Sequence, residues 1–136
     1  DLVARREVTT RLADGNLTIA ADFGPCEGRV YMVTSQALSA VSVEAPAEAK
    51  PGDEVTFKAA VLGEGGKPMD AVVPVRLEIL DPHGRAAEFS GYYGAKDGQV
   101  QVTAKLAPND VPGLWRVHVE ELASGLTSDA YMRVSR

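Results

Sequence analysis

The 136-residue sequence predicts an all-β fold, an antiparallel β-sandwich with an extra β-segment at its N-terminus. Three observations predict it. Apolar and polar residues alternate with a period of two through most of the chain, which is typical of strands with one buried face. Turn-forming Gly, Pro, Asp and Asn residues bound these runs at short intervals. No stretch repeats apolar residues at the spacing of an amphipathic helix, so we expect almost no helix.

The N-terminal third is predicted to contain two or three strands. The turn "ADGN" (13–16) is a strong hairpin signal, because Asp-Gly tolerates the positive φ angles of a type I′ turn. Strands are expected within 1–12, 17–23 and 28–35. So small a sheet is marginal by itself, and its apolar residues need a partner surface. These residues are Leu17, Ile19, Phe23, Val30 and Met32.

A change in character at "SQALS" (35–39) places a domain boundary near residue 37. We expect 1–37 to be the end of a preceding β-domain and 38–136 to be a complete sandwich of about seven strands. The segment 1–37 should either pack against 38–136 or self-associate, since open strand edges invite pairing. The sandwich should fold without it.

Six stretches of the sandwich alternate clearly enough to be predicted as strands. They are "LSAVSVEAP" (38–46), "EVTFKAAVLG" (54–63), "VPVRLEILDP" (73–82), "QVQVTAKL" (99–106), "LWRVHVEEL" (114–122) and "LTSDAYMRVS" (126–135). Residues on the apolar side of each run should face the core. This inward set is Val43, Val55, Phe57, Val61, Val75, Leu77, Ile79, Val100, Val102, Trp115, Val117, Val119 and Met132.

Trp115, the only tryptophan, admits two interpretations. It could anchor the core, or it could be a platform on which a ligand such as a sugar ring stacks. It lies in register with Val117 and Val119, and a tryptophan in that position usually fills the space between two sheets. Packing is therefore the favoured interpretation.

Composition excludes several classes of function. The net charge is −5 and the basic residues are scattered, which is unfavourable for binding nucleic acid. No apolar run approaches the length of a membrane span, and a single cysteine, Cys26, cannot form an internal disulfide. The only histidines, His83 and His118, have no second ligand at metal-binding spacing. Without a nucleophile elbow or a carboxylate pair across one cleft, we expect neither catalysis nor a cofactor.

Four turn motifs in the C-terminal hundred residues resemble those of the macroglobulin-type immunoglobulin-like domain. They are Pro51-Gly52-Asp53, Gly66-Lys67-Pro68, Asp81-Pro82-His83-Gly84 and Pro112-Gly113-Leu114-Trp115, the last with an extra leucine before the aromatic residue. The resemblance covers about 38–136. It implies an immunoglobulin-like β-sandwich and says little about function, because unrelated proteins use this sandwich as a spacer and adhesion unit.

A second resemblance concerns the stretch before the sandwich. Glu27-Gly28-Arg29-Val30-Tyr31 is similar to a strand in the small β-domain that closes some large bacterial glycoside hydrolases, where it precedes an appended immunoglobulin-like module. The two resemblances imply a non-catalytic spacer or packing module of a larger bacterial protein, plausibly a glycoside hydrolase. They also imply an extracellular or periplasmic location and neighbouring domains as partners.

A carbohydrate-binding module is the alternative function. The stretch "SGYYGAKDG" (90–98) contains adjacent tyrosines, of which one should face inward and one outward. An exposed tyrosine there could stack on a sugar or simply cover a sheet edge. The candidate ligand-binding residues are Tyr92, Tyr93 and Tyr31.

Overall fold

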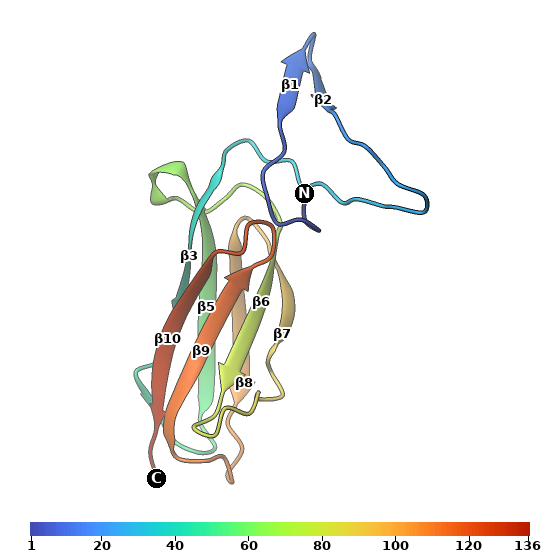
Figure 1. Ribbon diagram of the computed structural model, residues 1–136. Helices are drawn as coiled ribbons and strands as arrows, with labels where there is room; N and C mark the ends of the chain where they lie inside the picture. The colour runs from blue at the N-terminus through green and yellow to red at the C-terminus, as the bar shows by residue number, and fades with distance from the viewer.

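The computed structural model describes residues 1–136 and is all-β, with 49% of residues in strands and 2% in helix. Strands β3 to β10 form two facing sheets, and a separate hairpin, β1–β2, lies beyond one end of them (Figure 1). This confirms the predicted sandwich and the predicted scarcity of helix. The helical residues are one 3-10 turn, η1 (Glu64–Gly66).

One sheet has three antiparallel strands in the order β3-β5-β8. Their bounds are Leu38–Glu44, Glu54–Gly63 and Gln99–Lys105. The central strand β5 buries every second residue, as its sequence pattern predicts, and its inward side chains include Phe57 and Val61. Its bounds are those expected from the sequence.

The second sheet has five strands in the order β4-β10-β9-β6-β7. Their bounds are Glu48–Ala49, Thr127–Val134, Gly113–Glu121, Val73–Leu80 and Gly91–Ala95. The β10–β4 pair is parallel and the other pairs are antiparallel. The sandwich thus has eight strands rather than about seven. Neither the two-residue β4 nor the glycine-rich β7 has a marked alternation of apolar and polar residues.

The core between the sheets contains eighteen buried apolar residues. Ten of the thirteen predicted inward residues are among them. The other three, Val43, Val100 and Val102, pack against the core but stay partly exposed, because they lie on the edge strands β3 and β8. Met69 and Leu106, which lie outside the strands, are buried core residues beyond the predicted inward set.

Trp115 belongs to this core. Its side chain is 2% exposed, and its indole Nε1 donates a hydrogen bond to the carbonyl oxygen of Val111 at 2.9 Å. The ring therefore fills the space between the sheets, and its only polar atom is satisfied within the chain. This confirms the packing interpretation.

The hairpin forms where the sequence predicts it. Strands β1 (Thr10–Ala13) and β2 (Asn16–Ile19) are joined at Asp14 and Gly15, whose φ angles are 51° and 76°. These positive angles are those of the expected type I′ turn.

The predicted strand over 28–35 is wrong. This stretch forms no strand, and its one backbone hydrogen bond runs from the amide of Leu2 to the carbonyl of Val30 at 2.8 Å. A strand needs a neighbouring strand along its length, and none lies beside this stretch.

None of the helical residues forms an apolar helix of the length that a membrane crossing requires.

Candidate functional site

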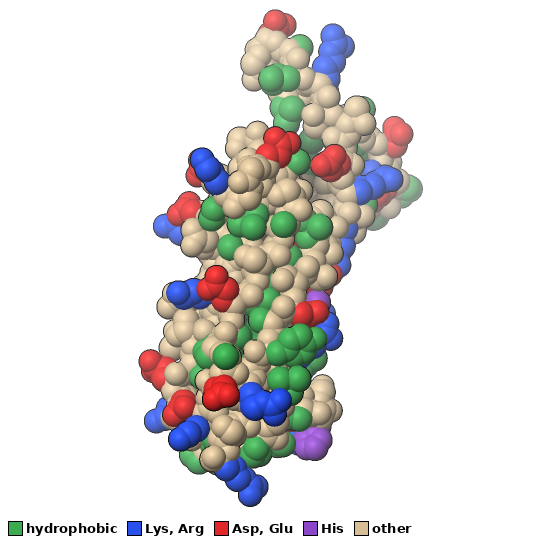
Figure 2. Space-filling model, turned by 90° about the vertical axis from the view of Figure 1, so that its left-hand side faces the viewer, with side chains coloured by type: hydrophobic (Ala, Val, Ile, Leu, Met, Phe, Trp, Pro, Cys, Tyr) green, Lys and Arg blue, Asp and Glu red, His purple; other side chains and the backbone are tan.

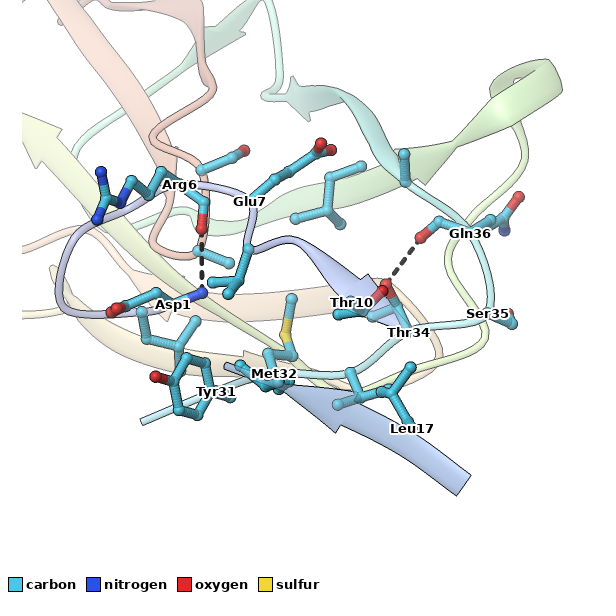
Figure 3. Close-up of a pocket in the computed structure, with 18 residues that line it drawn as sticks. Asp1, Arg6, Glu7, Thr10, Leu17, Tyr31, Met32, Thr34, Ser35 and Gln36 are labelled. Carbon is cyan, nitrogen blue, oxygen red and sulfur yellow. Dashed lines mark hydrogen bonds between the residues drawn. The ribbon is translucent and has the colours of Figure 1, made fainter. Parts of the chain in front are cut away.

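A cavity of about 440 Å³ lies where the N-terminal segment meets the sandwich (Figure 3). We call it the junction cavity. Strand β2 contributes Leu17 and Ile19, the stretch before β3 contributes Met32 and Val33, and the loop between β9 and β10 contributes Ser124. More than half of the eighteen lining residues are hydrophobic. The cavity is therefore mainly an apolar site, formed by parts of the chain that are far apart in sequence.

The hairpin above the cavity is amphipathic. In its register Leu12 pairs with Leu17 and Thr10 with Ile19, which places these four side chains on one face. Arg11 pairs with Thr18 on the opposite face. The apolar face is the one that lines the junction cavity, through Thr10, Leu17 and Ile19.

The polar groups at the cavity mostly form hydrogen bonds within their own loops. The Asp1 amine donates to the carbonyl of Arg6 at 3.0 Å, and the Asp1 carboxylate accepts the amides of Val3 and Ala4, both at 2.9 Å. The Thr34 hydroxyl donates to the carbonyl of Gln36 at 2.7 Å (Figure 3). These bonds fix the loops, and the chemistry that the cavity offers to a ligand is chiefly apolar contact.

A second hollow, of about 530 Å³, adjoins the cavity on the polar side of the hairpin. Arg6, Arg11, Arg29 and Thr18 line it. Arg29 is bound by Glu27 at 2.8 Å and lies over the ring of Phe23, with its central carbon 5.6 Å from the ring centroid. The hydrogen bond to Glu27 raises the pKa of Arg29, and the Gly24 amide and then Arg29 lower the pKa of Glu27.

The structure does not bring the three candidate tyrosines together. Tyr31 lines the junction cavity, whereas Tyr92 and Tyr93 lie on β7 and point to opposite faces. Tyr92 is 74% exposed, and its register partner on the outer face is Arg76. Tyr93 packs against the core, and its hydroxyl donates to the carbonyl of Phe89 at 2.9 Å. The expected inward and outward pair is present, with Tyr92 as the outward member.

Charged side chains cross the outer face of the five-stranded sheet in register. Glu78, His118 and Asp129 are direct cross-strand neighbours on β6, β9 and β10. Asp129 accepts hydrogen bonds from Arg116 Nε, at 2.8 Å, and lies 2.8 Å from His118 Nδ1. The sequence places His118 on the polar face, but this pairing depends on strand register, which local sequence does not reveal.

These contacts set the charge state of two groups. The hydrogen bond from Arg116 is the main cause that lowers the pKa of Asp129 below its usual value, and the bond from His118 adds to it. The same Asp129 contact raises the pKa of Arg116. The row is thus a paired surface network. No group of three His, Cys, Asp or Glu side chains is arranged to hold a metal ion.

No model of a known protein family and no curated protein matches the sequence. Solved structures do match. The trypsin-activated α-2-macroglobulin of Escherichia coli superposes with a TM-score of 0.60 and 17% identity, over 92% of this chain and 9% of that one. The native form of the same protein superposes with a TM-score of 0.59 and 16% identity, over 93% of this chain and 8% of that one. The chain has the fold of a macroglobulin-type immunoglobulin-like domain. It spans under a tenth of the length of those macroglobulins.

The superoxide reductase of Ignicoccus hospitalis is also similar, with a TM-score of 0.51 and 16% identity. The superposition covers 72% of this chain and 82% of the superoxide reductase chain. The two likenesses differ in extent. The native macroglobulin covers 93% of this chain, which is a larger share than residues 38–136 make up. The likeness to the macroglobulin therefore continues into the N-terminal segment. The immunoglobulin-like fold is therefore shared with proteins of unrelated function, and it does not assign an activity.

Proposed function

We propose that the chain is a non-catalytic spacer and packing module of a larger, exported bacterial protein. One observation carries the proposal. Strand β3 begins at the end of the sandwich that bears the hairpin, and β10 runs down to the opposite end, where the C-terminus lies (Figure 1). A domain that the chain enters at one end and leaves at the other separates its neighbours by its full length.

The outer surfaces support this role. Figure 2 shows charged side chains of both signs scattered over one face of the sandwich. Several charged side chains of the sandwich also form ion pairs with each other. Arg76 binds Glu78, and Arg85 binds Asp81 at 2.7 Å. Such a surface keeps a module separate from its surroundings without offering one concentrated charge to a partner. Export and a glycoside hydrolase as the parent protein are part of the proposal, and they rest on the sequence resemblances.

Removing the module from its parent protein tests the proposal. We compare the full-length parent with a variant in which 38–136 is replaced by a flexible linker of about ten residues, whose average span of roughly 17 Å is shorter than a ten-residue strand such as β5. A spacer predicts kcat for the parent's small soluble substrate within about two-fold of the original, because the reacting groups lie elsewhere. It also predicts a shorter maximum dimension in small-angle X-ray scattering. Loss of kcat in a folded variant would contradict a non-catalytic role.

Carbohydrate binding is the alternative, and the exposure of Tyr92 favours it. An exposed aromatic ring on a sheet face can stack on a sugar. Titration calorimetry of the chain against soluble polysaccharides separates the two functions. Saturable binding that Tyr92→Ala abolishes would favour the alternative. Tyr93→Ala and Tyr31→Ala are the companion variants, because Tyr93 packs against the core and Tyr31 lies in the junction cavity.

A further inference from the structure

Exposed apolar side chains are concentrated in the N-terminal segment. Of the ten large hydrophobic residues that are exposed in the whole chain, six lie within 1–37. They are Val3, Leu12, Leu17, Phe23, Val30 and Val33. A segment that makes up about a quarter of the chain thus carries more exposed apolar residues than the sandwich does. Exposed apolar side chains that gather into one patch mark a site of contact with another surface.

The hairpin directs its share of this surface to one side. Leu12 is 73% exposed and Leu17 43% exposed, although they form a cross-strand pair above the junction cavity. Val33, which also lines the cavity, is 64% exposed. The cavity is therefore flanked by apolar side chains that the chain itself does not cover.

Few contacts hold the segment to the sandwich. No backbone hydrogen bond joins 1–37 to 38–136. The polar link is the ion pair between Arg5 and Glu120, and Met32 is the one hydrophobic residue of the segment packed against the main core. The Gln36 side chain also lies against Gly63. A two-stranded hairpin has little stability of its own. A further partner surface would therefore stabilise its position.

The hairpin defines the chemistry of that partner. Strand β1 pairs only with β2, so each strand has one edge whose backbone groups are free to bind a further strand. A strand added there would place alternate apolar side chains against Leu12, Leu17 and the cavity. Arg11, on the opposite face of the hairpin, has no ion-pair partner in the chain. A carboxylate on the added strand or next to it in the partner would pair with Arg11.

We propose that the β1–β2 hairpin and the junction cavity bind the edge strand of a β-sheet in a neighbouring domain of the same polypeptide. This inference rests on the proposed function, since it requires a larger parent protein. The hairpin lies at the end where the chain enters the sandwich, so a domain attached there is held within reach at high effective concentration. The macroglobulin likeness, which continues into 1–37, shows that such a segment has a folded counterpart within much longer chains.

Hydrogen exchange of the full-length parent protein tests the docking. We compare it with the isolated chain 1–136 and follow the amides of 10–19, with the amides of β5 as the internal reference. Docking predicts that the hairpin amides exchange at least about a hundred-fold more slowly in the parent, because their opening then requires undocking. Leu12→Asp in the parent should abolish this protection. Leu114→Asp, a change of another exposed leucine on the sandwich, should leave it intact.

Each other outcome has a distinct meaning. Equal exchange of the hairpin in parent and isolated chain, with other folded domains present, overturns the docking and leaves the spacer function standing. A concentration-dependent dimer of the isolated chain with the same protection assigns the face to a second copy and also overturns the proposal. If the parent contains no further folded domain, the proposed function itself fails.

Discussion

Gly98 lies against the backbone of Met69, so closely that a Cβ on Gly98 would stand 2.5 Å from the Met69 amide nitrogen. That Cβ would also stand 2.8 Å from the carbonyl oxygen of Val61. Hydrogen bonds lock this approach, because Gly98 donates to the carbonyl of Ala71 at 2.9 Å and accepts from the Val61 amide at 2.7 Å. Only glycine fits, because the obstructing atoms belong to the backbone.

Gly98→Ala should therefore be much more harmful than the same change at Gly84. Both glycines have φ near 70°, at 68° and 77°, but a Cβ on Gly84 would meet nothing within 4 Å. Gly84→Ala should lower the free energy of unfolding by about 1–2 kcal/mol through backbone strain alone. Gly98→Ala should cost about 1–3 kcal/mol more because the chain must move. Urea denaturation measures both, and equal losses would contradict the close contact.

Trp115→Ala should lower the free energy of unfolding by about 3–5 kcal/mol, the usual cost of removing a large buried side chain. Trp115→Phe should cost less, because a smaller aromatic ring still fills part of the space, although some buried volume and the hydrogen bond to Val111 are lost. Thermal unfolding followed by circular dichroism gives both values. A stable Trp115→Ala variant would show that the ring does not anchor the core.

Glu121 is fully buried and caps the turn after β9. Its carboxylate accepts the amide of Ser124 at 3.0 Å and a hydrogen bond from the Ser124 hydroxyl at 2.5 Å, and it also binds the Ala123 amide. Glu121→Ala should lower the free energy of unfolding by about 2–4 kcal/mol, because it leaves these donors unsatisfied. Glu120→Ala is the matched control. It removes a partly exposed ion pair and should cost at most about 1 kcal/mol.

Stability should fall at acid pH partly through Asp129. Its pKa is lowered in the folded state, mainly by Arg116, so the carboxylate stabilises the fold above the unfolded pKa of about 3.9. The contribution is lost as the pH falls from about 4 through the lower folded pKa. Asp129→Asn should flatten the dependence of stability on pH in that window by a small amount, since the group is partly exposed. Carboxyl-carbon NMR of Asp129 that shows an ordinary pKa would contradict it.

Deletion of 1–37 should leave a folded, cooperatively melting sandwich. The truncation breaks no backbone hydrogen bond of 38–136 and removes the Arg5–Glu120 pair, the packing of Met32 and the contact of the Gln36 side chain with Gly63. We expect a loss of about 1–3 kcal/mol, the range of a single partly buried apolar contact with a surface ion pair. Circular dichroism and differential scanning calorimetry of 38–136 measure it. An unfolded product would show that the chain is one integrated domain.

The sequence allowed most of the sandwich to be predicted, because its strands have one buried face. Strand β5 was predicted to the residue, and the turn at Asp14 and Gly15 was correctly identified from its backbone requirements. The error over 28–35 has the opposite cause. Its residues have the composition of a strand, but whether a strand forms depends on a neighbour that local sequence does not specify.

The candidate site was less predictable. Tyr31 was singled out and lies in the junction cavity, but the cavity itself depends on how the hairpin is placed above the sandwich. The burial of Glu121 follows from strand parity, which puts it on the same side as Val119 and Val117. The buried carboxylate is stabilised because the backbone amides of the following turn donate hydrogen bonds to it. These amides reach the carboxylate only in the folded chain, so local sequence does not reveal the contact.

The placement of chain entry and exit at opposite ends of the sandwich also determines how the domain would respond to mechanical tension. A force that stretches the polypeptide would pull β3 and β10 lengthwise in opposite directions. Strand β10 is paired with β9 along eight residues, from Thr127–Glu120 to Val134–Gly113. The hydrogen bonds of this ladder lie across the direction of pull, so they would be sheared together and would not open one at a time. In the proposed spacer role, this strand arrangement would also make the domain resistant to extension.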